Sequence, residues 1–150
     1  MNMDPMLIQI LSAGLAGCGF AVIFHIRPKY LPLLFLGSAL GWYVYLMSEK
    51  IWSFRSMAMV MAAMAMTIYS EIFARVVRMP VSVIYTPIVI PLIPGSHLYY
   101  CMRGFVTDSR SDFITYGGYL LEDTLGLVLG SLFVLTFVSA IISRKKKTDK

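Results

Sequence analysis

The stretch PIVIPLIPGSHLYY, residues 87–100, places three prolines and a glycine inside a long apolar region of the chain. A proline within a helix removes one backbone donor and clashes with the carbonyl one turn earlier, which costs about 3 kcal/mol or more. Pro87, Pro91 and Pro94 together therefore predict a helix that is broken between Pro91 and Gly95. Such a break leaves backbone N–H and C=O groups without helical partners. The role of the break therefore depends on whether water, lipid or protein surrounds these groups.

Composition indicates that these surroundings are a membrane. Hydrophobic residues make up 58% and charged residues 14% of the 150 residues, which is more apolar surface than one small soluble core can bury. Asp4 is the only charged residue before the first apolar stretch, so we expect that stretch to remain as a span rather than act as a signal peptide. The net charge of +5 comes largely from basic residues at the ends of apolar segments, which favours membrane topology over a nucleic-acid partner.

Five segments are long and apolar enough to cross a bilayer, whose hydrocarbon core of about 30 Å needs about 20 residues per helix. We therefore predict an all-α integral membrane protein with one membrane domain, residues 1–143, and a basic cytoplasmic tail, residues 144–150. The expected spans are residues 6–25, 31–48, 56–77, 81–102 and 119–142. The long loop is expected at RGFVTDSRSDFITY, residues 103–116. The fourth segment either crosses with a break or enters and returns.

The distribution of Lys and Arg favours five crossings, because cytoplasmic loops are enriched in these residues. With five spans, nine of the 13 basic residues fall on one side and four on the other. The nine are Arg27, Lys29, Arg75, Arg78, Arg144, Lys145, Lys146, Lys147 and Lys150, and the four are Lys50, Arg55, Arg103 and Arg110. We expect the richer side to be the cytoplasm, which places the N-terminus outside a bacterial cytoplasmic (inner) membrane and the C-terminus in the cytoplasm.

Small residues four positions apart recur on four of the spans, and such pairs let helix backbones approach closely in lipid. The pairs are Ala13 with Gly17, Gly37 with Gly41, Ala58 with Ala62, and Gly126 with Gly130. They predict a crowded bundle. Because five helices enclose little interior, we expect some of these faces to meet another chain.

The broken helix itself predicts a cavity, because unpaired backbone at membrane depth is tolerated only where it is buried in protein or lines a wet space. Discontinuous helices in transporters direct a half-helix N-terminus at an anionic substrate group. We expect Ser96 to cap the second half-helix, Gly95 to adopt an unusual backbone conformation that admits a ligand, and Tyr99 to offer its hydroxyl. A kinked helix with a purely structural role is the alternative.

Four charged side chains are candidates for coupling or gating. Glu71 and Arg75 are spaced i, i+4 at the inner end of the third span, where an interfacial ion pair is the alternative. Glu122 and Asp123 precede an uncharged run, where helix capping at the outer surface is the alternative. If the last helix instead begins near Asp112, Glu122 lies inside the bundle and becomes the best proton site.

Other patterns favour packing over chemistry. Three methionines share one face of the third span without a His or Cys beside them, so we interpret them as packing residues rather than a copper site: Met57, Met61 and Met64. Four aromatic residues near the outer end of the second span are typical of an interfacial belt: Trp42, Tyr43, Tyr45 and Trp52. Cys18 and Cys101 indicate neither a disulfide framework nor a metal site. We expect no cofactor, no metal and no enzymatic activity.

Three stretches resemble the threonine/serine exporter family, in its C-terminal half or separately encoded small subunit. PLIPG at residues 91–95, followed by Tyr99, is similar to the signature of the family. FHIRPKYL at residues 24–31, after the first span, resembles the family's Phe-x-x-Pro loop. GSALGW at residues 37–42 resembles the glycine-rich start of its second span, and the similarity extends over roughly residues 8–140. Members of the family comprise two halves of about five spans each. The resemblance therefore implies a small subunit that acts with a larger membrane subunit, with a higher oligomer as an option.

The resemblance also implies that the substrate is a small carboxylate metabolite, either threonine or serine or a dicarboxylate such as succinate. The expected substrate-binding residues lie at the break: Pro91, Pro94, Gly95, Ser96, His97 and Tyr99. An accessory or scaffold membrane subunit with no substrate path of its own is the alternative. Such a subunit would not need a polar break at mid-depth.

The charge asymmetry makes a prediction about topology. A reporter fused after Lys150 should report the cytoplasm, and a tag placed before Met1 should be reached by an impermeant reagent from outside. Intact and permeabilised cells distinguish the two sides. Both ends on the same side would contradict the five-span arrangement.

Overall fold

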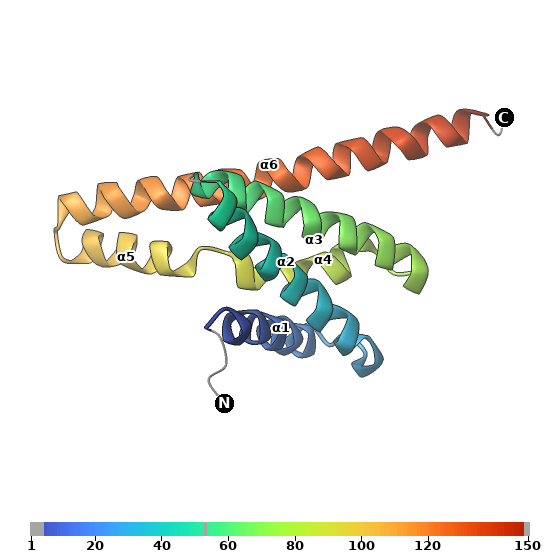
Figure 1. Ribbon diagram of the computed structural model, residues 1–150, viewed down its shortest axis with the longest axis horizontal. Coiled ribbons are helices and arrows are strands. Elements are labelled where there is room, and N and C mark those ends of the chain that lie inside the picture. Colours follow the sequence, from blue (N-terminus) through green and yellow to red (C-terminus); the bar gives the residue numbers. More distant parts are fainter. Residues whose placement is uncertain (1–4, 53, 149–150) are drawn as a thin grey trace.

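The computed structural model describes residues 5–52 and 54–148, and side chains are described as far as residue 141. Every regular element in these ranges is helical (Figure 1). The elements are α1 (Pro5–Ile23), η1 (Pro28–Tyr30), α2 (Leu31–Ile51), α3 (Arg55–Val77), α4 (Val81–Val89), η2 (Ile90–Leu92), α5 (Gly95–Val106) and α6 (Arg110–Thr148). Four helices in the described part can cross a membrane, and α4 with α5 makes a fifth if the bent pair is one span. The predicted all-α membrane fold is confirmed.

The first three helices follow one another as hairpins joined by short turns (Figure 1). His25, just after α1, and Arg78, at the end of α3, have φ angles of 55° and 58°. A residue in this left-handed region ends a helix, and the chain can then reverse direction. Pro28 follows His25 and starts η1, because proline fits the first position of a helical turn, and Pro80 follows Arg78 as the N-cap residue of α4.

The fourth segment is broken where the prolines predict. Pro87 lies within α4, Pro91 lies in the short 3₁₀ turn η2, and Pro94 directly precedes α5. The axes of the two halves, Val81–Leu92 and Gly95–Val106, differ by 59°. Pro94 rather than Ser96 occupies the N-cap position, and no side chain caps α5. The expected role of Ser96 as a cap is therefore wrong, because Gly95 already belongs to the helix.

The connection between α5 and α6 is much shorter than the sequence predicts. α5 continues to Val106 and α6 begins at Arg110, well before the expected span start at residue 119. Only residues 107–109 form a turn, in which Asp108 has a φ angle of 55°. The polar residues in 103–116 lie on an antiparallel helical hairpin, in which Gly104 lets the start of α6 approach: a Cβ there would lie 2.6 Å from the Phe113 amide nitrogen. The basic tail continues α6 as far as Thr148, and residues 149–150 lie outside the described part.

The small-residue pairs pack against helices of this same chain. Gly17 on α1 faces Ser38 on α2, and Gly41 on α2 faces Met66 on α3. Gly126 and Gly130 on α6 lie against the backbone of α3. Ala13, Gly37, Ala58 and Ala62 are likewise buried. The expectation that some of these faces meet another chain is therefore wrong, since each pair fills a contact within the bundle.

The hairpin of α5 with the start of α6 extends beyond the ends of α1, α2 and α3 (Figure 1). α5 packs mainly against α6. The outward faces of the hairpin carry large exposed side chains: Leu98, Tyr99, Met102, Phe105, Val106, Phe113 and Ile114. Apolar side chains of this size contact lipid or another protein when they are not buried in the chain itself.

Packing between α3 and α6 generates a stability prediction. A Cβ at Gly130 would lie 2.5 Å from the Val60 carbonyl oxygen and 3.0 Å from the Ala63 Cβ, whereas a Cβ at Gly118 of the same helix meets nothing within 4 Å. Gly130→Ala should lower the stability of the purified protein by about 1–3 kcal/mol through overpacking. Gly118→Ala is the matched control and should be neutral or stabilising, since alanine is the better helix former. Thermal unfolding in detergent measures both, and equal effects would contradict the packing described.

Candidate functional site

A cavity of about 250 Å³ lies at the break of the fourth segment, between α2, α3, α5 and α6. Its lining residues are Trp42, Tyr45, Arg55, Met59, Leu92, Ile93, Pro94, Gly95, Ser96, His97 and Asp123. Most of the lining is aromatic or apolar. Arg55, His97 and Asp123 add one basic, one titratable and one acidic group. The break therefore opens onto a small cavity that contains charge.

Asp123 is the buried acid of this cavity, with an exposed fraction of 0%. Its Oδ2 lies 2.7 Å from His97 Nδ1, and an ionised carboxylate can only accept, so the ring N–H donates. Its Oδ1 lies 3.6 Å from Arg55 Nε, which is an ion-pair distance but too long for a hydrogen bond. Among the described residues Oδ1 has no hydrogen-bond partner. One carboxylate oxygen is thus held, and the other is buried without a hydrogen-bond partner among the described residues.

The glycine face of α6 explains why this particular acid is buried. Asp123, Gly126 and Gly130 are spaced i, i+3 and i+7 and therefore share one helical face. Because Gly126 lies directly against the Ser56 carbonyl, the same face carries Asp123 to the first turn of α3, which begins at Arg55. The positive end of a helix dipole favours a carboxylate at this place.

The first turn of α5 supplies free backbone donors to the same cavity. The Gly95 amide donates to the Ile93 carbonyl over 2.7 Å, and the Leu98 amide donates to the Pro94 carbonyl over 3.2 Å. The amides of Ser96 and His97 have no acceptor among the described residues. A helix N-terminus with free amides binds anions through these donors and through its dipole.

The residues predicted for substrate binding divide into two groups. Pro94, Gly95, Ser96 and His97 line the cavity. Pro91 lies in η2 and shapes the break without lining the space. The Tyr99 side chain is 64% exposed and packs against the Tyr100 ring, so it points away from the cavity in this chain.

Gly95 does not have the backbone conformation that we expected of it. No glycine in the described residues has a positive φ angle, and Gly95 begins an ordinary helix. A Cβ at Gly95 meets nothing within 4 Å. The expectation of an unusual conformation is therefore wrong, and Gly95 contributes open space beside the Ser96 and His97 amides.

The coupling candidates also lie in different places. Glu71 and Arg75 form an ion pair of 3.0 Å within α3, and neither residue lines the cavity. The last helix does begin near Asp112, but Glu122 is only half-buried and lies outside the lining, whereas its neighbour Asp123 is fully enclosed. Asp123, rather than Glu122, is thus the carboxylate of α6 that faces the cavity.

Four cavity residues from α2 and α3 were not expected at the site: Trp42, Tyr45, Arg55 and Met59. Leu92 and Ile93, within the broken segment itself, were not expected there either. Trp42 and Tyr45 were assigned to an interfacial belt, which Tyr43 and Trp52 suit better because they are 48% and 51% exposed. The Trp42 indole N–H is buried without a hydrogen-bond partner among the described residues. The described residues contain no cluster of three metal-ligating side chains.

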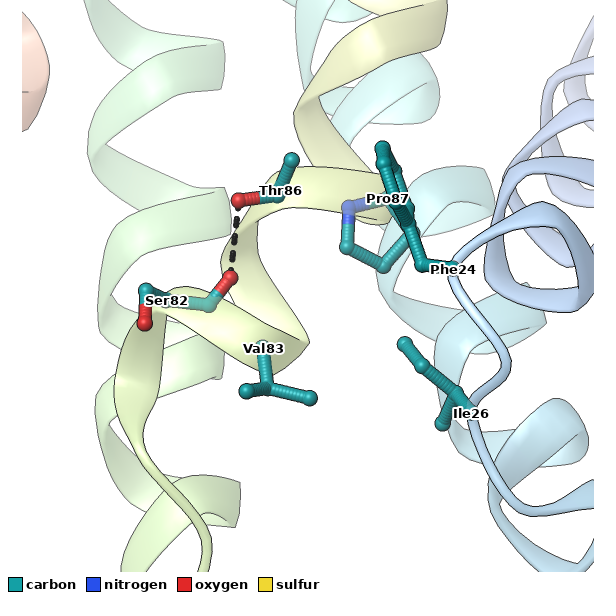
Figure 2. A pocket seen from close by; sticks show the side chains of 6 residues that line it. All are labelled: Phe24, Ile26, Ser82, Val83, Thr86 and Pro87. Atoms are coloured by element: carbon teal, nitrogen blue, oxygen red, sulfur yellow. Dashed lines mark hydrogen bonds between the residues drawn. The ribbon is translucent and has the colours of Figure 1, made fainter.

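A second hollow, of about 280 Å³, lies between the end of α1 and α4 (Figure 2). Its lining residues are Phe24, Ile26, Ser82, Val83, Thr86 and Pro87. The Thr86 hydroxyl donates to the Ser82 carbonyl over 2.8 Å within α4. Pro87 has no N–H, so the Val83 carbonyl loses its helical donor beside this hollow. No charged side chain lines this hollow, so it adds space beside Pro87 of α4 rather than a charged site.

A helical membrane protein whose broken span surrounds a buried charge and free helix amides has the organisation of a transporter. The family comparison agrees. The chain belongs to the threonine/serine exporter family, because the family model described as threonine/serine exporter, ThrE, matches residues 9–148. The resemblance drawn from the PLIPG stretch is thus confirmed. No curated protein and no solved structure matches the chain.

The pair of Asp123 and His97 makes a prediction about stability. Removing one partner of a buried pair costs about 3–5 kcal/mol, whereas replacing both by apolar residues is often neutral. His97→Leu should therefore destabilise the protein strongly, and the double variant His97→Leu with Asp123→Leu should regain most of the loss. Thermal unfolding of His97→Leu, Asp123→Leu and the double variant completes the double-mutant cycle. Additive losses would show that the two side chains do not interact.

Proposed function

We propose that the chain is the small subunit of a two-component membrane exporter, and that the cavity at the break is its part of the substrate site. The observation that carries this proposal is Asp123, a fully buried carboxylate with one oxygen free, beside Arg55 and the free amides of α5. Burying a charge costs several kcal/mol. A scaffold subunit without a substrate path gains nothing from a buried charge. The cost of burying Asp123 therefore disfavours the scaffold alternative.

The charges favour a zwitterionic amino acid, threonine or serine. The substrate ammonium group binds the free Oδ1 of Asp123, and its carboxylate binds the Ser96 and His97 amides with Arg55 nearby. A dicarboxylate such as succinate brings a second negative charge to a cavity that already contains a buried carboxylate. Succinate export therefore requires that Asp123 be neutralised first, which makes it the second candidate.

A larger membrane subunit completes the substrate path in this proposal. The small-residue faces are used within the chain, so the partner contacts the projecting hairpin of α5 and α6, where Tyr99 is 64% exposed. This contact gives Tyr99 a role at the boundary between the two subunits. Lipid covers the rest of the spans, and further copies of the pair extend the assembly to a higher oligomer.

The proposed setting is a bacterial cytoplasmic (inner) membrane with the N-terminus outside. The nine-to-four Lys and Arg asymmetry supports this orientation. It places the open side of the cavity, where Arg55 is 44% exposed, toward the exterior. Glu71 and Arg75 then lie near the cytoplasmic side, where their ion pair is available as an inner gate.

Threonine efflux from loaded cells tests the proposed function. Co-expression with the larger subunit should give efflux that is lost, by tenfold or more, in Arg55→Gln and Asp123→Asn. Arg27→Gln, which changes an exposed arginine before η1, outside both the cavity and the hairpin of α5 and α6, is the matched control and should export like the wild type. Succinate efflux from cells loaded with succinate is measured in the same way and tests the second candidate substrate.

Efflux that persists in Asp123→Asn, with the protein still inserted and assembled, would place the substrate path elsewhere. Succinate efflux without threonine efflux would favour the second candidate. Membrane insertion and co-purification of the two subunits are measured for every variant, since a lost assembly gives the same loss of efflux for a different reason.

A further inference from the structure

We propose that His97 and Asp123 together are the coupling-ion site of the exporter, and that the ion is a proton which competes with the substrate ammonium group. This inference rests on the proposed function and deepens it. It transfers the proton role from Glu122, where the sequence placed it, to a residue pair that joins α5 and α6 across the cavity.

The geometry of the pair suits a proton. His97 Nδ1 lies 2.7 Å from Asp123 Oδ2, and the two side chains are only 10% and 1% exposed. The imidazole is the side chain whose charge most readily changes near neutral pH. With Nδ1 occupied by the hydrogen bond to Asp123, the arriving proton adds to Nε2, and no bond in the pair has to break.

The groups around the pair disfavour a metal cation. Hard cations need several oxygen ligands, and the described residues contain no further acidic group in the cavity and no cluster of three metal-ligating side chains. A proton needs only one lone pair, which the imidazole provides.

The other titratable groups near the pair are tyrosines. Tyr45 from α2 lines the same cavity. The rings of Tyr116 and Tyr119 on α6 lie 6.5 and 5.7 Å from the His97 ring, centroid to centroid. Tyrosine remains neutral near neutral pH. His97, Asp123 and Arg55 are therefore the groups whose charges decide what binds.

Competition between the proton and the ammonium group follows from these charges. With a neutral imidazole, Asp123 keeps negative charge for the substrate ammonium group at Oδ1. When His97 gains a proton, the imidazolium and the Arg55 guanidinium together outweigh the one carboxylate, and the ammonium group is released. A proton that enters from outside therefore expels the substrate on that side, which is the exchange an exporter requires.

Proton release on substrate binding tests this inference directly. The full-length chain, purified with the subunit that co-purifies with it, is placed in weakly buffered solution near pH 6 with a pH indicator. L-threonine should release protons from the wild type. Glu122→Gln, which removes the adjacent carboxylate outside the cavity, is the matched control and should release as many. His97→Gln keeps an amide donor for Asp123 and should bind threonine while releasing less than one tenth as many protons.

Transport provides a second readout. In proteoliposomes, exchange of labelled for unlabelled threonine should continue in His97→Gln, whereas acceleration of threonine transport by an imposed pH gradient should be lost. His97→Asn serves as a second variant if His97→Gln does not fold. Proton release by His97→Gln equal to that of the wild type would overturn the inference alone, as would threonine binding to the wild type without proton release. Absence of threonine binding to the wild type would overturn the proposed function together with this inference.

Discussion

The burial of one carboxylate, Asp123, is the constraint on which the rest of the site depends. A charge without solvent is stable only when opposite charges and donors surround it. Arg55 from α3 and His97 from α5 supply them, at 3.6 and 2.7 Å. Since α5 packs mainly against α6, the contact between His97 and Asp123 also fixes how the second half-helix starts. The same interaction therefore holds the start of α5 beside the groups that line the cavity.

The prolines make the break predictable because their effect is local. Pro87, Pro91 and Pro94 act on the backbone of their own segment, and the structure places the break where their spacing predicts. Local sequence does not determine which of the two carboxylates, Glu122 or Asp123, is buried. Neighbouring residues on a helix point about 100° apart, so only the packing of α6 decides which carboxylate is buried. The spacing of Asp123 from Gly126 and Gly130 contains that information, once the glycines are known to face α3.

Long-range contacts account for the remaining differences. Arg55 belongs to the cavity only because α3 starts beside α6, and no pattern within residues 55–77 indicates this. The polar residues 103–116 are typical of a loop in composition, but a hairpin needs only one left-handed residue, Asp108, to reverse the chain. Small-residue pairs indicate close packing without indicating the partner. Here the packing partners are helices of the same chain, and in the proposed exporter the hairpin of α5 and α6 is the surface that contacts the other subunit.

The central claim is that a substrate binds between Asp123, Arg55 and the N-terminus of α5. Cryo-electron microscopy of the assembled exporter with L-threonine measures this directly. The account predicts a broken fourth segment with threonine in the cavity, its ammonium group within hydrogen-bond distance of Asp123 and its carboxylate at the Ser96 and His97 amides. A continuous helix through Pro91–Gly95, or threonine bound elsewhere while Asp123 remains closed off by protein, would contradict it.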